Sequence, residues 1–160
     1  ALNLMGIEHG VFWSMEFMGY VLEPVRVDKL SLMFGYLFHL ASFIAVVYAL
    51  HIKDTVQHVA GLAYAASAVG AVFAGDLLTL FVFWELLALT SVFLIWARKT
   101  DRAYSSGFRY LIIQVLSGVL LLAGLLILAQ VNNSLLFNQI SLNHEGLAQV
   151  GAWLIFLAFG

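Results

Sequence analysis

The 160-residue chain contains no cysteine, a single proline and few charged residues. Without cysteine it can hold no disulfide, no thiolate-bound iron–sulfur cluster and no cysteine-ligated zinc. It has only seven lysines and arginines and a net charge of −2, which excludes the basic surface that nucleic-acid binding requires. Charged residues make up 10% of the chain and hydrophobic residues 63%, whereas soluble domains carry about 25% charged residues. This composition predicts an integral membrane protein.

Long apolar runs predict membrane-spanning helices along most of the chain. The expected helices cover residues 30–51, 56–75, 77–97, 108–129 and 147–160. We therefore expect an all-α integral membrane bundle of about four full transmembrane helices plus a truncated fifth. Because the sequence starts at Ala1 and stops at Gly160 inside an apolar run, we expect it to be part of a longer membrane protein.

Residues 1–29 do not form a span, because polar residues interrupt each apolar stretch before it reaches a spanning length. The interrupting residues are Glu8, His9, Glu16 and Glu23. The aromatic residues of this segment fit the belt at a membrane surface, and Pro24 predicts extended or turn structure. We expect an interfacial, extracytoplasmic segment here.

The distribution of basic residues predicts the orientation of the bundle. The first and third interhelical loops carry Lys53, Arg98, Lys99, Arg102 and Arg109, whereas the opposite side carries only Arg26 and Lys29. The positive-inside rule therefore predicts that the loop of residues 98–109 is cytoplasmic. We expect a multi-pass protein of the cell's inner (plasma) membrane.

Glu85 interrupts the third apolar run near its middle, with only apolar residues beside it for several positions in each direction. A charged side chain at that depth costs about 2.5–3.5 kcal/mol on insertion scales, and such residues usually face a bundle interior or a water path. A carboxyl held between desolvation and a nearby cation can exchange protons near neutral pH. We interpret Glu85 as a proton-transfer carboxylate. The alternative is a protonated side chain that hydrogen-bonds between helices.

Two further polar residues have both a structural and a functional interpretation. Asp76 is expected to cap the third helix, with cation or proton access as the alternative. It precedes Glu85 by nine residues, so the two side chains should face opposite directions. His39, in the middle of the first span, is expected to be a hydrogen-bonded packing group, with a proton relay as the alternative.

Gln114, Ser117 and Gly118 form a polar seam on the fourth span, for which interhelical hydrogen bonding and a water-lined surface are both open. No phosphate-cradling glycine loop, nucleophile motif or metal-ligand spacing occurs in the sequence. Among the histidines only His39 lies deep in a span, which argues against a bis-histidine haem. We expect no cofactor and no metal.

The segment GDLLTLFVFWELLALTSVFLIW (residues 75–96) resembles the glutamate-bearing helix of the proton-translocating antiporter-like membrane subunits. These subunits occur in respiratory complex I, in membrane-bound hydrogenases and in Mrp-type cation/proton antiporters. The core of the match is Trp84-Glu85, followed by a serine and by Leu-Ile before a basic loop. Three other stretches resemble the family: VRVDKLSLMF (25–34), YLIIQVLSGVLLLAG (110–124) and FNQISLN (137–143). The paired VLEPVRVD and GDLL are most similar to the D subunit of Mrp-type antiporters.

The resemblance implies that Glu85 pairs with a lysine on a discontinuous helix that follows a polar loop. That helix corresponds to the run from Leu147, and no lysine occurs after Lys99, so we expect the partner beyond Gly160. The resemblance also implies the first repeat of an inverted-repeat transporter. Its implied partners are membrane lipid, other subunits of a membrane complex, H⁺ and Na⁺.

Three functional hypotheses follow. The first is a proton-conducting subunit of a multisubunit Na⁺/H⁺ antiporter, a transporter subunit rather than an enzyme, with Glu85 as the carboxylate. The second is a proton-pumping membrane-arm subunit of an NADH:quinone oxidoreductase or membrane hydrogenase, whose redox centres lie in other chains. The third is a structural membrane subunit without transport, in which Glu85 is a packing residue. Coupling to bicarbonate uptake is a further use that the family leaves open.

Overall fold

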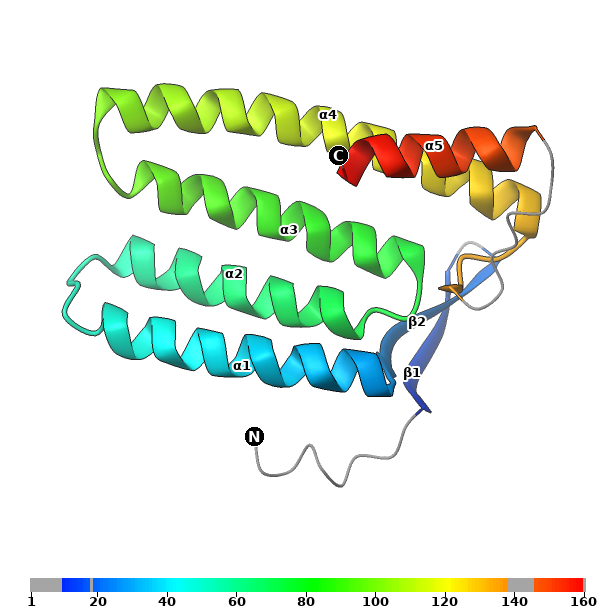
Figure 1. Ribbon diagram of the computed structural model, residues 1–160, viewed down its shortest axis with the longest axis horizontal. Helices are drawn as coiled ribbons and strands as arrows, with labels where there is room; N and C mark the ends of the chain where they lie inside the picture. Colours follow the sequence, from blue (N-terminus) through cyan, green and yellow to red (C-terminus); the bar gives the residue numbers. More distant parts are fainter. Residues whose placement is uncertain (1–9, 18, 138–145, 160) are drawn as a thin grey trace.

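The computed structural model describes residues 10–17, 19–137 and 146–159. Within these residues the chain forms a β-hairpin followed by helices that lie side by side (Figure 1). The elements are β1 (Gly10–Phe17), β2 (Tyr20–Val27), α1 (Lys29–Ala49), α2 (Thr55–Phe73), α3 (Leu77–Trp96), α4 (Asp101–Asn132) and α5 (Leu147–Phe159). Outside the described residues lie Glu8, His9, most of the FNQISLN stretch and Gly160.

Helices α1 to α4 are each long and apolar enough to cross a membrane. They form one row in which each helix packs against the next, and α5 packs against α4 (Figure 1). The prediction of an all-α integral membrane bundle with four full spans and a shorter fifth helix is confirmed. The row also separates α1 from α4 by two intervening helices.

The fourth helix begins earlier than predicted. Thr100 caps it by accepting a hydrogen bond from the backbone N–H of Ala103 (3.2 Å), and the helix continues to Asn132. The predicted loop of residues 98–109 is therefore wrong for residues 101–109, which are helical. Hydropathy identifies only the apolar part of a helix, and Arg102 and Arg109 are exposed on the helical turns at its start.

The segment expected to be extended around Pro24 is the second strand of an antiparallel hairpin, in which Phe17 pairs with Tyr20 and Gly10 with Val27. Pro24 lies where the register of the two strands shifts, a position that tolerates a residue without an N–H donor. Strand β1 is exposed along its whole length. The hairpin adds a small β element to the helical bundle that the sequence did not predict.

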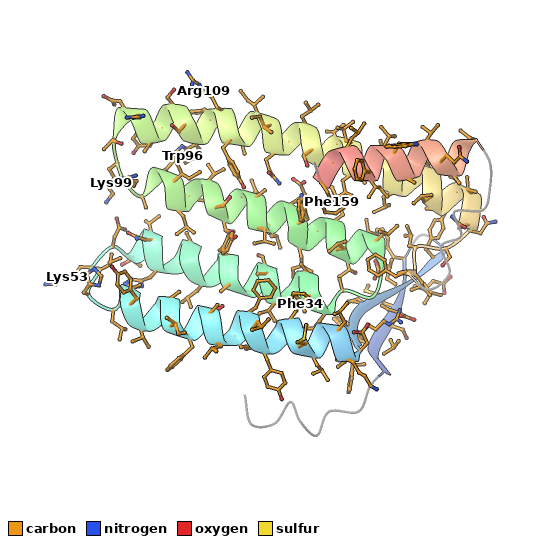
Figure 2. The ribbon with its side chains drawn as sticks, viewed as in Figure 1. Phe34, Lys53, Trp96, Lys99, Arg109 and Phe159 are labelled. Carbon is orange, nitrogen blue, oxygen red and sulfur yellow. The ribbon has the colours of Figure 1, made fainter. Side chains whose placement is uncertain are left out.

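The loops α1–α2 and α3–α4 lie at the same end of the bundle, as expected from their basic residues. The Lys99 ammonium lies 2.7 Å from the Asp54 carboxylate and joins the two loops (Figure 2). Their mutual attraction lowers the pKa of Asp54 and raises the pKa of Lys99, mainly through the hydrogen bond between them.

The hairpin end of the bundle contains a continuous apolar core. Its buried members come from β2, α3, α4, the segment after α4 and α5: Leu22, Leu77, Leu125, Leu128, Ala129, Leu135 and Ala148. Burial of these side chains fixes α3, α4 and α5 relative to one another. This core therefore also positions the residues in the middle of α3, α4 and α5.

Candidate functional site

Glu85 lies on the face of α3 that packs against α4. Ala88 and Val92, three and seven residues further along α3, are buried on the same face. The Oε1 atom of Glu85 is itself buried and has no hydrogen-bond partner among the described residues. The structure therefore places Oε1 at the α3–α4 interface, whereas the Glu85 side chain as a whole is half-buried.

Gly118 on α4 provides the space that the carboxyl occupies. A Cβ added at Gly118 would overlap Glu85 Oε1 and would lie 2.8 Å from Cδ and 3.2 Å from Oε2. All three of the nearest atoms belong to the Glu85 carboxyl. Gly118, a member of the predicted polar seam, thus leaves room for the carboxyl because it has no side chain.

Ser117, the neighbour of Gly118, connects α4 to α5. Its hydroxyl donates a hydrogen bond of 2.6 Å to the backbone carbonyl of Ala158 in the last described turn of α5. This is the interhelical hydrogen bond that was one of the two interpretations of the seam. From α3, the ring of Trp84 packs edge to face on Phe159 with the ring centroids 4.7 Å apart. The neighbours of Glu85 and of Gly118 therefore both contact the same turn of α5.

Two glycines bring α4 and α5 into close contact further along. A Cβ at Gly124 would lie 2.7 Å from the carbonyl oxygen of Gly151, and one at Gly151 would lie 3.1 Å from that of Gly124. Small residues at such crossings let two backbones approach closely within a membrane.

Toward the basic-loop end, the α3–α4 interface has two more contacts that the sequence did not reveal. The hydroxyls of Ser91 and Tyr110 are hydrogen-bonded at 2.9 Å. The Trp96 indole covers Gly107, and its buried Nε1 has no hydrogen-bond partner within the described part of the chain (Figure 2 labels Trp96). The interface is thus polar at intervals between Glu85 and the loop.

Asp76 is completely buried and caps α3, as predicted. Its Oδ1 accepts from the backbone N–H of Thr79 (2.8 Å). Its Oδ2 accepts from the hydroxyl of Thr79 (2.8 Å) and from the backbone N–H of Glu23 on β2 (2.9 Å). Asp76 thus also ties the hairpin to the bundle. Its alternative role in cation or proton access stays a prediction.

His39 does not lie near Glu85. It is exposed on α1, two helices away from the α3–α4 interface, and its Nδ1 is hydrogen-bonded to the carbonyl of Gly35 (2.7 Å). The predicted hydrogen bond is present, but the side chain faces outward rather than packing within the bundle. A relay role for His39 stays a prediction.

An apolar groove of about 720 Å³ runs between α1, α2 and α3 and reaches Trp84 and Phe159. Small residues line it on α1 and α2, such as Ala45 and Gly61. Within the described ranges, no three histidine, aspartate or glutamate side chains converge as ligands of a metal ion would.

Comparison with known proteins places this architecture. Residues 74–160, more than half of the chain, match the family described as "NADH:quinone oxidoreductase/Mrp antiporter, TM". In a search of solved structures, 26 chains match this one. One, from "Structure of Mrp complex from Dietzia sp. DQ12-45-1b", is 23% identical, with a TM-score of 0.84 over 98% of this chain.

This chain spans only 18% of the length of that Dietzia chain, and at this identity the likeness shows the fold alone. A search of curated proteins finds no match. The family match covers the helix of Glu85, the helix of Gly118 and the described part of α5. The chain therefore belongs to the family of membrane subunits shared by NADH:quinone oxidoreductases and Mrp antiporters.

Proposed function

We propose that this chain is part of a proton-conducting subunit of a multisubunit Na⁺/H⁺ antiporter, with Glu85 as the proton-transfer carboxylate. One observation carries the proposal: the carboxyl lies midway along a spanning helix, and its buried Oε1 has no hydrogen-bond partner among the described residues. A buried charge without a partner is strongly unfavourable, so such a group binds a proton or faces a mobile cation.

The packing interpretation of Glu85 has less support. It required a protonated side chain that hydrogen-bonds between helices, yet Oε1 makes no such bond to the described part of α4. Instead the nearest surface of α4 is Gly118, which offers space and no side-chain partner. A packing role would be served better by an apolar side chain of similar volume.

The position of α5 supports the expected pairing of Glu85 with a lysine. Ser117 and Trp84 hold the last described turn of α5 beside the residues that adjoin Glu85 and Gly118. This turn of α5 therefore adjoins the part of the α3–α4 interface that contains the carboxyl, where a lysine would supply the missing counter-charge.

The proposal also includes the partner subunits of the protein, its membrane and its orientation. Similarity to an Mrp complex supports further membrane subunits as partners. The proposal that the D subunit is the counterpart of this chain depends only on the resemblance of VLEPVRVD and GDLL. Exposed apolar side chains on α1, α4 and α5 fit membrane lipid or neighbouring subunits. We place the protein in the plasma membrane with the α1–α2 and α3–α4 loops on the cytoplasmic side. The second candidate function is that of a proton-pumping subunit driven by a redox complex, because the family description includes NADH:quinone oxidoreductase.

The test is Glu85→Gln in the full-length protein within its complex, measured as sodium-dependent proton movement in everted membrane vesicles. We expect the variant to lose antiport at normal abundance, whereas Glu16→Gln on the exposed strand β1 keeps it. Retained antiport in the Glu85 variant contradicts the proposal. Proton movement that responds to NADH or hydrogen and not to a sodium gradient would instead support the redox candidate.

A further inference from the structure

We infer that Ser117 and Gly118 of α4 are a positioning pair, in which Gly118 seats the Glu85 carboxyl and Ser117 holds the adjoining turn of α5 beside it. The inference rests on the proposed function of Glu85. It assigns to two neutral residues the task of fixing where the proton-carrying group meets the next helix.

Gly118 acts on the carboxyl and not on the helix backbone. The three atoms nearest to an added Cβ are Oε1, Cδ and Oε2 of Glu85, the mobile end of a flexible side chain. A methyl group here would therefore displace the carboxyl while the helices stay in place. Gly124 is the opposite case, because its Cβ would meet the backbone oxygen of Gly151 and would force α4 and α5 apart.

Ser117 uses its hydroxyl differently from two other hydroxyl residues of the bundle. Ser67 and Thr90 each donate to a carbonyl four residues earlier on their own helix, at 2.8 and 2.7 Å. Ser117 instead donates to Ala158 on α5, at 2.6 Å. Its hydrogen bond therefore fixes the position of one helix against another.

The two contacts act at one place. Ser117 and Gly118 are consecutive, and Trp84, next to Glu85, packs on Phe159, next to Ala158. The distance between the carboxyl and α5 is thus determined from both α3 and α4. Proton transfer depends steeply on such distances, and a displacement of about 1 Å can lower a rate by about 100-fold.

The matched control is Gly107, which lies on the same helix and at the same interface. A Cβ there would also overlap a side chain of α3, but the side chain is Trp96 and not Glu85. Gly107→Ala therefore reproduces the crowding of Gly118→Ala without touching the carboxyl.

The experiment compares these variants in the full-length protein within its complex, with rates normalised to abundance. For Gly118→Ala we expect the maximal antiport rate to fall by roughly 10-fold or more, with the half-saturating sodium concentration changed by less than about 2-fold. We expect Gly107→Ala to stay within about 2-fold of the unmodified protein in both. The infrared carboxyl band that Glu85→Gln removes should shift in Gly118→Ala and not in Gly107→Ala.

Ser117 is tested by rescue. We expect Ser117→Ala to lower the maximal rate and Ser117→Thr, which keeps the hydroxyl, to restore most of it. Equal loss in both variants would overturn the role of the hydroxyl.

Equal rates and equal infrared bands in Gly118→Ala and Gly107→Ala would overturn the role of Gly118. If the Gly118→Ala complex does not assemble, combining it with Glu85→Asp tests the same contact, because the shorter side chain removes the overlap. Assembly of the double variant supports the inference, and its failure overturns it. Retained antiport in Glu85→Gln would contradict the proposed function itself, independently of these variants.

Discussion

Asp76, which caps helix α3, and Glu85, midway along that helix, have carboxyl groups with opposite surroundings. Asp76 accepts three hydrogen bonds, two from Thr79 and one from Glu23. Glu85, nine residues later, has a buried oxygen without a partner among the described residues. The fold explains Asp76 completely, because its bonds cap the helix and attach the hairpin. The fold does not explain Glu85, whose carboxyl makes no hydrogen bond within the described part of the chain.

The difference separates stability from function. A buried polar group that is fully hydrogen-bonded contributes to folding, whereas an unpartnered one lowers stability. The proposed proton exchange with a partner would account for Glu85, whose carboxyl the packing of the helices does not explain. The comparison predicts that substitutions at the two positions affect different measurements.

The largest effect is expected for Glu85→Leu in the full-length protein. Antiport should fall by roughly 100-fold or more, because the proposed proton-carrying group is removed. Thermal stability of the purified complex should not fall, since a buried, unpartnered oxygen is replaced by an apolar group of similar size. Tryptophan fluorescence melting of the complex measures the second part. A clear loss of stability would show that Glu85 is a packing residue.

Asp76→Leu is expected to show the reverse pattern. Loss of the helix cap and of the bond to Glu23 should lower the free energy of unfolding by about 2–4 kcal/mol. The amount of complex in the membrane should decrease, while the antiport rate per assembled complex is kept. Asp76→Asn should be intermediate, because its amide still offers one acceptor oxygen. Normal stability with lost antiport would instead favour the access role of Asp76.

Tyr110→Phe tests a neutral interhelical bond near Glu85. Removing the phenolic hydroxyl breaks the 2.9 Å hydrogen bond to Ser91 without changing the packing of the ring. Hydrogen bonds between membrane helices contribute about 0.6 kcal/mol on average, so we expect a small decrease in melting temperature. A decrease as large as that of Asp76→Leu would mean that this bond, too, is essential to the fold.

The sequence predicted the bundle because apolar runs of spanning length have few alternative structures. It also predicted the cap at Asp76, which depends only on residues next to it in the chain. It missed the first turns of α4, because those turns lie outside the apolar run. The hairpin was missed because β1 is exposed and its pairing with β2 has an irregular register.

The contact between Glu85 and Gly118 could not be predicted from the sequence. Trp96 meets Gly107, and Glu85 precedes Trp96 by 11 residues just as Gly118 follows Gly107 by 11. In two antiparallel helices, equal offsets from one contact place Glu85 and Gly118 at the same depth. Once that first contact is known the second follows, but nothing local to the sequence identifies the first.

The smallest effect is expected for a carboxylate outside the spans, Asp54, whose partner is a lysine. The Lys99 ammonium lowers the pKa of Asp54 below its ordinary value, mainly by hydrogen bonding, so the pair contributes to stability only while Asp54 is charged. That contribution is present above the ordinary pKa of an aspartate and is lost as the pH falls through the lowered value. Lys99→Met should raise the pKa of Asp54, as carboxyl NMR titration would show.

The Lys99 variant should leave melting temperature and antiport nearly unchanged, because the Lys99 side chain is 70% exposed and solvent and salt screen such pairs. Asp54 also accepts a hydrogen bond from the backbone N–H of Val56 (3.0 Å), so the cap of α2 persists without the lysine. A large loss of stability would show that the two loops depend on this ion pair. In that case a surface ion pair, and not only the hydrogen bonds of Asp76, would stabilise the bundle. The comparison of Asp76 with Glu85 would then have to include this surface pair.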